Sequence, residues 1–154
     1  MIDPTAQRAL LSRYPTGVTV VCAMTKAGPI GITVNSFASV SLDPPLVLWS
    51  IGKASDRYEA FRSAKAFTIN ILTADQADLA QHHAQSSMLI DGQWETAGNG
   101  APRISGAAGT LECRQHAVHP GGDHDILVGE VTALHQGPAA PSLTFFKSGY
   151  GRIG

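Results

Sequence analysis

The residues best suited to chemistry in this chain form one run, positions 31–42, which reads GITVNSFASVSL. We predict a β-strand here, because apolar and polar residues alternate with the two-residue period of a strand. One face suits a core and consists of Ile32, Val34, Ser36, Ala38, Val40 and Leu42. The other face carries neutral hydrogen-bonding groups around one aromatic ring and consists of Gly31, Thr33, Asn35, Phe37, Ser39 and Ser41. Because this second face has no acid, base or thiol, it is equipped to hold a ligand rather than to attack one.

Two further groups of candidate residues lie in predicted turns. Residues 52–55 (GKAS) form a loop before a helix predicted at 56–65, with Ser55 as its capping residue. A helix start beside Lys53 and Ser55 would attract phosphate, although a loop lysine also commonly serves only solubility. The second group is a Gly-Asp-His turn that ends at His124. A neutral polar strand with a phosphate site beyond it fits a flavin, whose own chemistry would carry a hydride transfer.

Other reaction classes lack the residues that they require. The chain has no Gly-x-Ser-x-Gly elbow for hydrolysis, and it has neither GxxxxGK[ST] nor GxGxxG for nucleotide phosphates. The six histidines include no HExxH pair and no paired CxxC is present, so we predict no metal site. Eleven basic and twelve acidic residues give a net charge of −1 with no basic run, and we therefore expect no nucleic-acid partner.

Length and composition limit the architecture. The 154 residues are 44% hydrophobic and 15% charged, which suits a single globular domain over positions 1–154. No apolar stretch approaches the roughly 20 residues that cross a bilayer, so we expect no membrane association. The first residues lack the features of a secretory signal, which makes the cytoplasm the expected location. Cys22 and Cys113 are expected to be buried thiols rather than a disulfide.

The elements that must position the candidate residues are mostly strands. Strands are predicted at 17–25, 31–42, 46–51, 66–72, 109–118, 125–135 and 142–146. Residues 85–105 are predicted as a loop and residues 149–154 as a glycine-rich tail. Six or seven strands with two or three short helices favour a closed or partly closed antiparallel barrel, because so many open edges would be a liability.

Two predicted helices carry clear start signals. Asp3 is a suitable capping residue for a first helix, with Pro4 at its first position and Pro15 as its stop. Thr73 and Gln76 have the spacing of a capping box, which predicts a helix that reaches about residue 84.

Four sequence blocks resemble the short-chain flavin reductase family. They are residues 15–21 (PTGVTVV), 31–48 (GITVNSFASVSLDPPLVL), 67–72 (FTINIL) and 122–130 (GDHDILVGE), and they occur in the family's order. The resemblance implies a mainly β, antiparallel FMN-binding split barrel of Greek-key type, working as a homodimer with the flavin near the subunit boundary. It also implies that NADH or NADPH reduces FMN or FAD, and that the reduced flavin passes to a separate monooxygenase. The alternatives are a non-catalytic flavin-binding or electron-carrier protein on the same barrel, or a small-ligand barrel without flavin.

The resemblance also assigns roles to individual positions. The residues that it places along the isoalloxazine ring are Thr33, Val34, Asn35 and Ser36, and the same strand continues the binding surface with Ser39, Val40 and Ser41. The candidates for the phosphate end are Ser50, Lys53 and Ser55. His124 would face the nicotinamide, and Tyr150 would close over the site. The alternatives are a simple turn residue for His124 and plain terminal packing for Tyr150.

Overall fold

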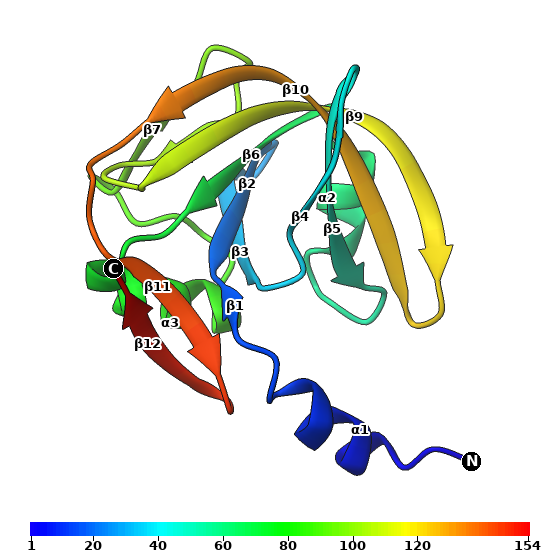
Figure 1. Cartoon of the computed structure of the whole chain (residues 1–154). Coiled ribbons are helices and arrows are strands. Elements are labelled where there is room, and N and C mark those ends of the chain that lie inside the picture. Colours follow the sequence, from blue (N-terminus) through cyan, green and yellow to red (C-terminus); the bar gives the residue numbers. More distant parts are fainter.

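A computed structural model describes residues 1–154, and its largest element is a seven-stranded antiparallel sheet (Figure 1). In chain order its strands are β2 (Thr19–Thr25), β3 (Gly28–Val34), β4 (Ala38–Leu42), β5 (Pro45–Gly52), β6 (Ala66–Ile71), β9 (Gly109–Gly121) and β10 (His124–Gln136). Their order across the sheet is β3-β2-β6-β9-β10-β5-β4. Strands β3 and β4, which follow each other in the sequence, are therefore the two outer edges of the sheet.

This order requires the sheet to curl into a barrel with one gap. Only residues 35–37 connect β3 to β4, and a chain of this length reaches at most about 14 Å. The two edges must lie within that distance although five other strands separate them along the sheet. The sheet is thus a barrel that is split between β3 and β4, and we call residues 35–37 the crossing segment.

Smaller elements surround the barrel. A three-stranded sheet joins β1 (Thr16–Gly17), β11 (Ser142–Phe146) and β12 (Gly149–Ile153), and a two-stranded sheet joins β7 (Trp94–Thr96) and β8 (Pro102–Ile104). The helices are α1 (Pro4–Leu11), α2 (Tyr58–Ser63), the 3-10 turn η1 (Ala74–Gln76) and α3 (Ala77–Gln85). Helix α1 buries none of its residues and projects away from the barrel in Figure 1. None of the helices is both long and apolar enough to span a membrane.

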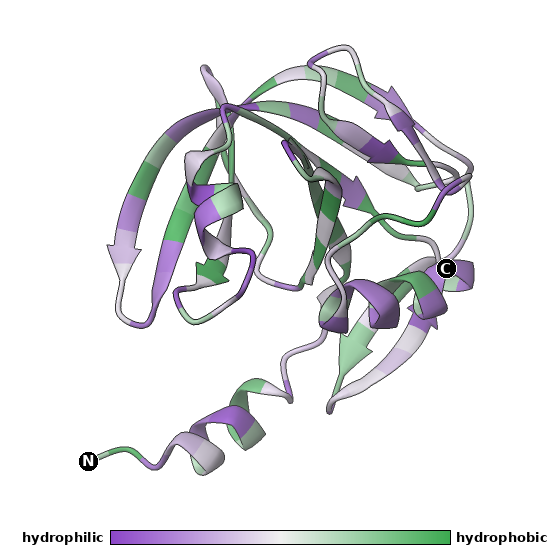
Figure 2. Cartoon of the chain, turned by 180° about the vertical axis from the view of Figure 1, so that it is seen from behind, coloured by the Kyte–Doolittle hydropathy of each residue, from purple (hydrophilic) through white to green (hydrophobic).

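Two apolar clusters form the core because the strands alternate their side chains. Figure 2 shows hydrophobic and hydrophilic residues alternating along the long strands. The first cluster lies around Trp49, whose ring meets Phe61 of α2 edge to face at 5.2 Å. The second cluster contacts the other side of β2 and includes Val20, Leu72 and Leu143. Strand β2 is therefore buried on both faces from residue 19 to residue 23.

Several local predictions are confirmed. The Asp3 carboxylate accepts hydrogen bonds from the main-chain N–H groups of residues 5 and 6, and Pro4 begins α1. The capping box of Thr73 and Gln76 is formed and precedes α3. The strand predicted at 17–25 is present as β2, which forms a hairpin with β3, and Cys22 and Cys113 are buried free thiols.

The predicted continuous strand at 31–42 is wrong, because the chain leaves one sheet edge at residue 34 and joins the other at residue 38. The alternation continues through the crossing segment, so the local pattern gives no sign of the break. The expected core face is also wrong at its far end, where Val40 is 49% exposed and Leu42 is 96% exposed. Both residues lie on β4, an edge strand with a bulge between Ser39 and Ser41.

Three other predictions need correction. The helix predicted at 56–65 spans only Tyr58–Ser63, and Ser55 bonds the N–H of Arg57 without being the capping residue. The predicted loop 85–105 contains the hairpin of β7 and β8. The glycine-rich tail is strand β12, which pairs with β11 over five residues. In the last two cases, hairpin pairing with the neighbouring strand orders sequence that lacks strand propensity of its own.

Candidate functional site

The crossing segment bridges the split of the barrel and is tied to the neighbouring strand by one serine. The Ser36 hydroxyl accepts a hydrogen bond from the N–H of Ser50 at 2.9 Å and lies 3.3 Å from the carbonyl oxygen of Ser50, to which it donates. The main-chain N–H and C=O groups of residues 35–37 make no hydrogen bond to other main-chain groups. Because the barrel does not close here, these groups are free to bind a ligand.

His124 lies at the start of β10, directly beside the end of β5. It pairs in register with Gly52, and a side chain at position 52 would meet the His124 Nε2 atom at 3.6 Å. Its Nδ1 atom lies 2.7 Å from the Asp123 carboxylate. The N–H of Lys53 also donates to the carbonyl of Asp123 at 2.9 Å. The crossing segment, the end of β5 and the β9–β10 turn therefore meet at one end of the barrel.

A pocket of about 1060 Å³ opens between these elements and the segment that leads from α1 into β1. It brings together three of the predicted site residues, Asn35, Ser36 and His124. The remaining lining residues are Arg8, Leu11, Ser12, Tyr14, Pro15, Thr16, Gly17, Val18, Thr19, Phe37, Ala38, Ile71, Phe145 and Ser148. The lining contains no carboxylate, so the pocket wall is neutral or basic.

This pocket suits a flavin ring and a second planar group. Its wall offers free main-chain groups at residues 35–37 and the aromatic ring of Phe37. The buried hydroxyl of Thr16 has no hydrogen-bond partner in the protein, and an unpaired buried polar group is costly unless something satisfies it. The polar edge of an isoalloxazine or a carboxamide carries the complementary donors and acceptors.

Thr33, Val34 and Tyr150 line a smaller neighbouring pocket of about 180 Å³. The two pockets share Val18, Asn35 and Phe145 as lining residues. The Thr33 hydroxyl donates to a carbonyl of α3 at 2.6 Å, so it holds the helix against β3. Tyr150 packs against Phe145 with ring centres 5.5 Å apart, and burial raises the pKa of its phenol.

The other predicted site residues lie outside both pockets. Ser39, Val40 and Ser41 follow the exposed edge of the barrel on β4. Lys53 Nζ lies 3.9 Å from the Asp125 carboxylate, which Tyr58 also contacts through its hydroxyl. The hydroxyl of Ser55 accepts the N–H of Arg57 at 3.1 Å. Ser50 adjoins the pocket only through its main-chain bonds to the crossing segment.

Sequence reasoning missed two pocket residues, Arg8 and Thr16. Arg8 is on α1, and no local pattern in the sequence indicates where that helix lies relative to the barrel. Thr16 belongs to the block at 15–21, which contributes to the family resemblance but to which the sequence assigns no site residue. Both residues meet the rest of the pocket lining only in the folded protein, so a local sequence pattern does not identify them as pocket residues.

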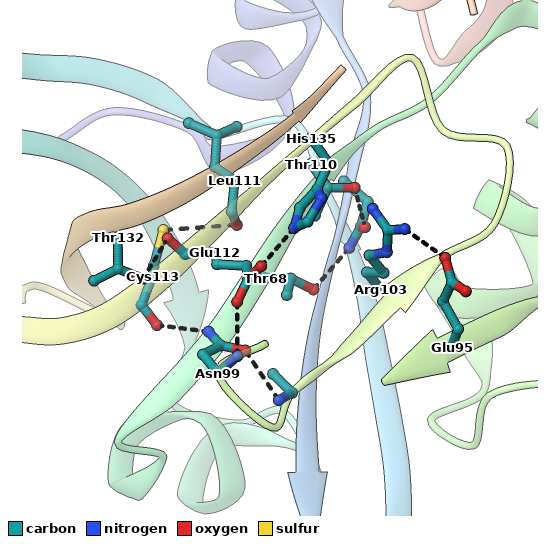
Figure 3. A network of polar contacts seen from close by, with 12 residues as sticks. Thr68, Glu95, Asn99, Arg103, Thr110, Leu111, Glu112, Cys113, Thr132 and His135 are labelled. Atoms are coloured by element: carbon teal, nitrogen blue, oxygen red, sulfur yellow. Dashed lines mark hydrogen bonds and ion pairs between the residues drawn. The ribbon is translucent and has the colours of Figure 1, made fainter. Parts of the chain in front are cut away.

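A buried polar network lies elsewhere on β9 and β10 (Figure 3). The Glu112 carboxylate contacts His135 Nε2 and accepts the N–H of Asn99 at 2.7 Å. Burial would raise the pKa of Glu112, but the hydrogen bonds from His135 and Asn99 outweigh it and lower the pKa. The Asn99 amide also donates to the carbonyls of Phe67 and Cys113 at 3.2 Å each. This network attaches the loop before β8 to the barrel, and the chain gathers no group of three or more His, Cys, Asp or Glu that could hold a metal.

The pocket at the split of the barrel is lined mainly by neutral side chains, together with Arg8 and His124. Residues 11–154 match the family model described as flavin reductase like domain. The chain belongs to this family of flavin reductases, which are oxidoreductases.

Individual relatives cover almost the whole chain. It is 48% identical over 147 residues to FMN reductase (NADH) SmoA of Agrobacterium fabrum, covering 95% of this chain and 84% of that protein. It is 35% identical over 152 residues to the reductase component of 4-hydroxyphenylacetate 3-monooxygenase from Thermus thermophilus, covering 96% and 95%. The solved NADH:FAD oxidoreductase SgcE6 of Streptomyces globisporus, also described in complex with NAD and FAD fragments, superposes with a TM-score of 0.91. Its uncomplexed structure shares 36% identity and covers 100% of this chain and 96% of its own.

Proposed function

We propose that this protein transfers a hydride from NADH or NADPH to FMN or FAD and supplies the reduced flavin to a partner monooxygenase. The observation that carries the proposal is the pocket without carboxylates at the barrel split, where Asn35, Ser36 and His124 meet in a chain of the flavin reductase family. The names of the relatives support both donor and acceptor, and the Thermus relative supports the monooxygenase role. The donor preference and the flavin preference are properties that the experiment below measures.

The chemistry of this reaction belongs to the bound flavin, which accepts the hydride from a reduced nicotinamide. The task of the protein is to bind the two rings in contact and in the correct orientation. The crossing segment offers the flavin ring Asn35, Ser36 and free main-chain groups, and His124 faces the nicotinamide. No acid–base pair is needed at the reacting atoms, which agrees with a pocket lining that contains no carboxylate.

The remaining predicted residues keep their roles as part of the same proposal. Thr33, Val34 and Tyr150 flank the ring through the neighbouring pocket. Ser39, Val40 and Ser41 extend the binding surface along the edge strand. The phosphate end runs past the Asp123–His124 turn toward Ser50, Lys53 and Ser55, and the main-chain bond from Lys53 to Asp123 supports this path because it joins the two loops.

The protein works as a homodimer in this proposal, with the flavin near the subunit boundary. The support is the amount of apolar surface that one chain leaves uncovered beside the pocket. On α1, Leu10 is 68% exposed and Leu11 is 63% exposed, and on the edge strand Leu42 is 96% exposed. These two surfaces have the sequence pattern of buried elements, so a second copy of the chain is the natural cover.

The cytoplasm is the proposed compartment. The support is the state of Cys22 and Cys113, which are free thiols, as is usual in a reducing compartment. Burial raises the pKa of the Cys113 thiol to about 12, so this thiol is not reactive.

The test measures NADH and NADPH oxidation with riboflavin, FMN and FAD in turn, on protein whose mass in solution is determined by light scattering. We expect acceleration with at least one flavin, and a mass of two chains. Tight flavin retention without oxidation of either donor would favour the non-catalytic carrier instead. A colourless protein that leaves flavin fluorescence unchanged would overturn the flavin site itself.

A further inference from the structure

A buried carboxylate beside the proposed phosphate end has two cationic partners. Asp125 of β10 is only 5% exposed. One of its oxygens lies 3.9 Å from Lys53 Nζ, and the other lies 3.6 Å from Arg62 Nε of α2. The second oxygen also accepts the hydroxyl of Tyr58, on the same helix. One negative charge therefore faces two positive charges, which leaves an excess of one positive charge in this group.

The carboxylates on the adjoining segments bond other groups. Asp56, just before α2, lies 3.2 Å from Arg57 Nε. Asp123, in the turn before β10, lies 2.7 Å from His124 Nδ1. Neither carboxylate forms an ion pair with the two cations beside Asp125, so their excess charge is available to an anionic ligand.

Lys53 is held loosely and away from the large pocket. Successive residues of a strand point to opposite faces, so Asp125 points away from the face on which His124 lines that pocket. Lys53 follows Asp125 to this other face, which explains why it lies outside both pockets. Its side chain is 45% exposed, and 3.9 Å is long for an ion pair. The main-chain bond to Asp123 fixes the start of the side chain, while the ammonium is free to exchange partners.

Asp125 keeps two partners when Lys53 leaves it. The hydrogen bond to Asp125 is the main cause that raises the pKa of Tyr58, so the phenol keeps its proton and remains a donor. Arg62 remains as the positive partner. A buried carboxylate without partners would be costly, and these two contacts avoid that cost. The ammonium of Lys53 can therefore move to a ligand with little loss of stability.

We propose that Asp125 competes with the flavin phosphate for Lys53 and thereby weakens the binding of phosphorylated flavins. The inference rests on the proposed function, because it takes Lys53 as the cation of the phosphate end. In the protein without ligand, Asp125 is a positioning residue that holds the ammonium, and a phosphate withdraws it by forming charge-assisted hydrogen bonds. This competition limits what the phosphate adds to affinity, which suits a protein that has to release its reduced flavin to a second protein.

The first test compares FMN with riboflavin, which has no phosphate, through dissociation constants measured by flavin fluorescence. Asp125→Asn removes the charge and keeps an oxygen that accepts the Tyr58 hydroxyl. We expect it to lower the FMN dissociation constant about two- to fivefold, because a partly exposed pair contributes little, and to leave that of riboflavin unchanged. Asp56→Asn is the matched control, because it removes the same charge three residues from Lys53 but its partner is Arg57. It should change neither constant.

The second test repeats the comparison in the Lys53→Ala background. We expect Asp125→Asn to have no effect on FMN binding there, because no ammonium remains to be released. Arg62→Gln changes an exposed side chain and provides an independent measurement if Asp125→Asn does not fold. Without Arg62, Lys53 is the only cation on Asp125, so FMN binding should weaken about twofold, and this effect should also vanish in Lys53→Ala.

The inference is overturned if neither variant changes FMN affinity, or if the changes persist without Lys53. Equal changes for FMN and riboflavin, together with a lower melting temperature, would also overturn it, in favour of a purely structural role for Asp125. These measurements need no nicotinamide. If no donor is oxidised with any flavin, the proposed function fails, and the binding constants still decide whether Asp125 competes for Lys53.

Discussion

His83 should make the stability of this protein depend on pH over an unusual range. It lies near the end of α3 with no exposed surface, and its Nδ1 atom is 3.2 Å from the carbonyl oxygen of Ser86. Its Nε2 atom is buried without any partner. Protonation of Nε2 would therefore bury a charged N–H with no acceptor, close to the guanidinium of Arg57, which donates to the His83 carbonyl at 2.7 Å.

The size of this effect follows from the pKa. Burial lowers the pKa of His83 from 6.5 to about 4, and the nearby positive charges of His82 and Arg57 add to the decrease. Between these two values the unfolded chain binds a proton that the folded protein excludes, so the free energy of unfolding decreases as the pH falls through this range. A pKa lowered by this amount corresponds to at most about 3 kcal/mol of unfolding free energy. This stability is fully present above about pH 6.5 and is lost as the pH falls toward about 4.

The assay compares urea unfolding of the wild type and His83→Gln between about pH 7.5 and about pH 4.5. His82→Gln is the control, because the His82 ring is adjacent at 4.7 Å and partly exposed, and its charge lowers the pKa of His83 less than burial does. The quantity compared is the change of unfolding free energy with pH, so a uniform loss of stability in the variant does not matter. We expect a decrease over this range that is smaller by about 2 kcal/mol in His83→Gln than in the wild type or His82→Gln. Equal pH dependence in all three proteins would refute the reasoning.

Three further predictions concern packing, assembly and the pocket. A Cβ atom at Gly137 would lie 1.8 Å from the Ala107 carbonyl oxygen, so Gly137→Ala should lower the unfolding free energy by about 3 kcal/mol or more in a denaturant titration. A Cβ atom at Gly17 would have nothing within 4 Å, so the control Gly17→Ala should change the unfolding free energy by less than about 1 kcal/mol. Leu42→Asp should convert a dimer to monomers in light scattering at micromolar concentration, and an unchanged mass would remove this residue from the interface. Lys53→Ala should weaken FMN binding about fivefold and riboflavin binding little, as measured by flavin fluorescence, because Lys53 is the cation at the proposed phosphate end of the site. Equal weakening of both would exclude a phosphate contact.

The parts of the fold that the sequence predicts correctly are governed by short-range chemistry. Asp3 and Pro4 define a helix start through one capping side chain, and Thr73 and Gln76 define another. The β2–β3 hairpin likewise follows from two strand-like runs on either side of a turn. In each case the partners lie in one short stretch of the chain, so composition and spacing contain the necessary information.

The parts that sequence reasoning missed depend on pairing and packing that local residue patterns do not indicate. The tail at 149–154 has little strand propensity, and its pairing with β11 is what makes it a strand. Alternation at 31–42 correctly indicates extended chain, but it cannot indicate that the chain changes from one sheet edge to the other. Arg8 reaches the pocket only because α1 lies beside the barrel opening. The resemblance named Asn35, Ser36 and His124, which the fold brings to one pocket, but it did not indicate that Lys53 contacts Asp125.

The pocket and the split of the barrel both arise at the crossing segment. A fully closed barrel would pair every main-chain group between neighbouring strands and leave none for a ligand. Here the chain crosses the gap in three residues, and Ser36 bonds both main-chain groups of Ser50 that a neighbouring strand would otherwise pair. That side-chain contact keeps the gap at a fixed width while the main-chain groups of the crossing segment stay unpaired. The crossing segment therefore separates the two sheet edges and also forms the surface that the flavin would contact. This second role explains why the segment contains hydrogen-bonding residues without charge.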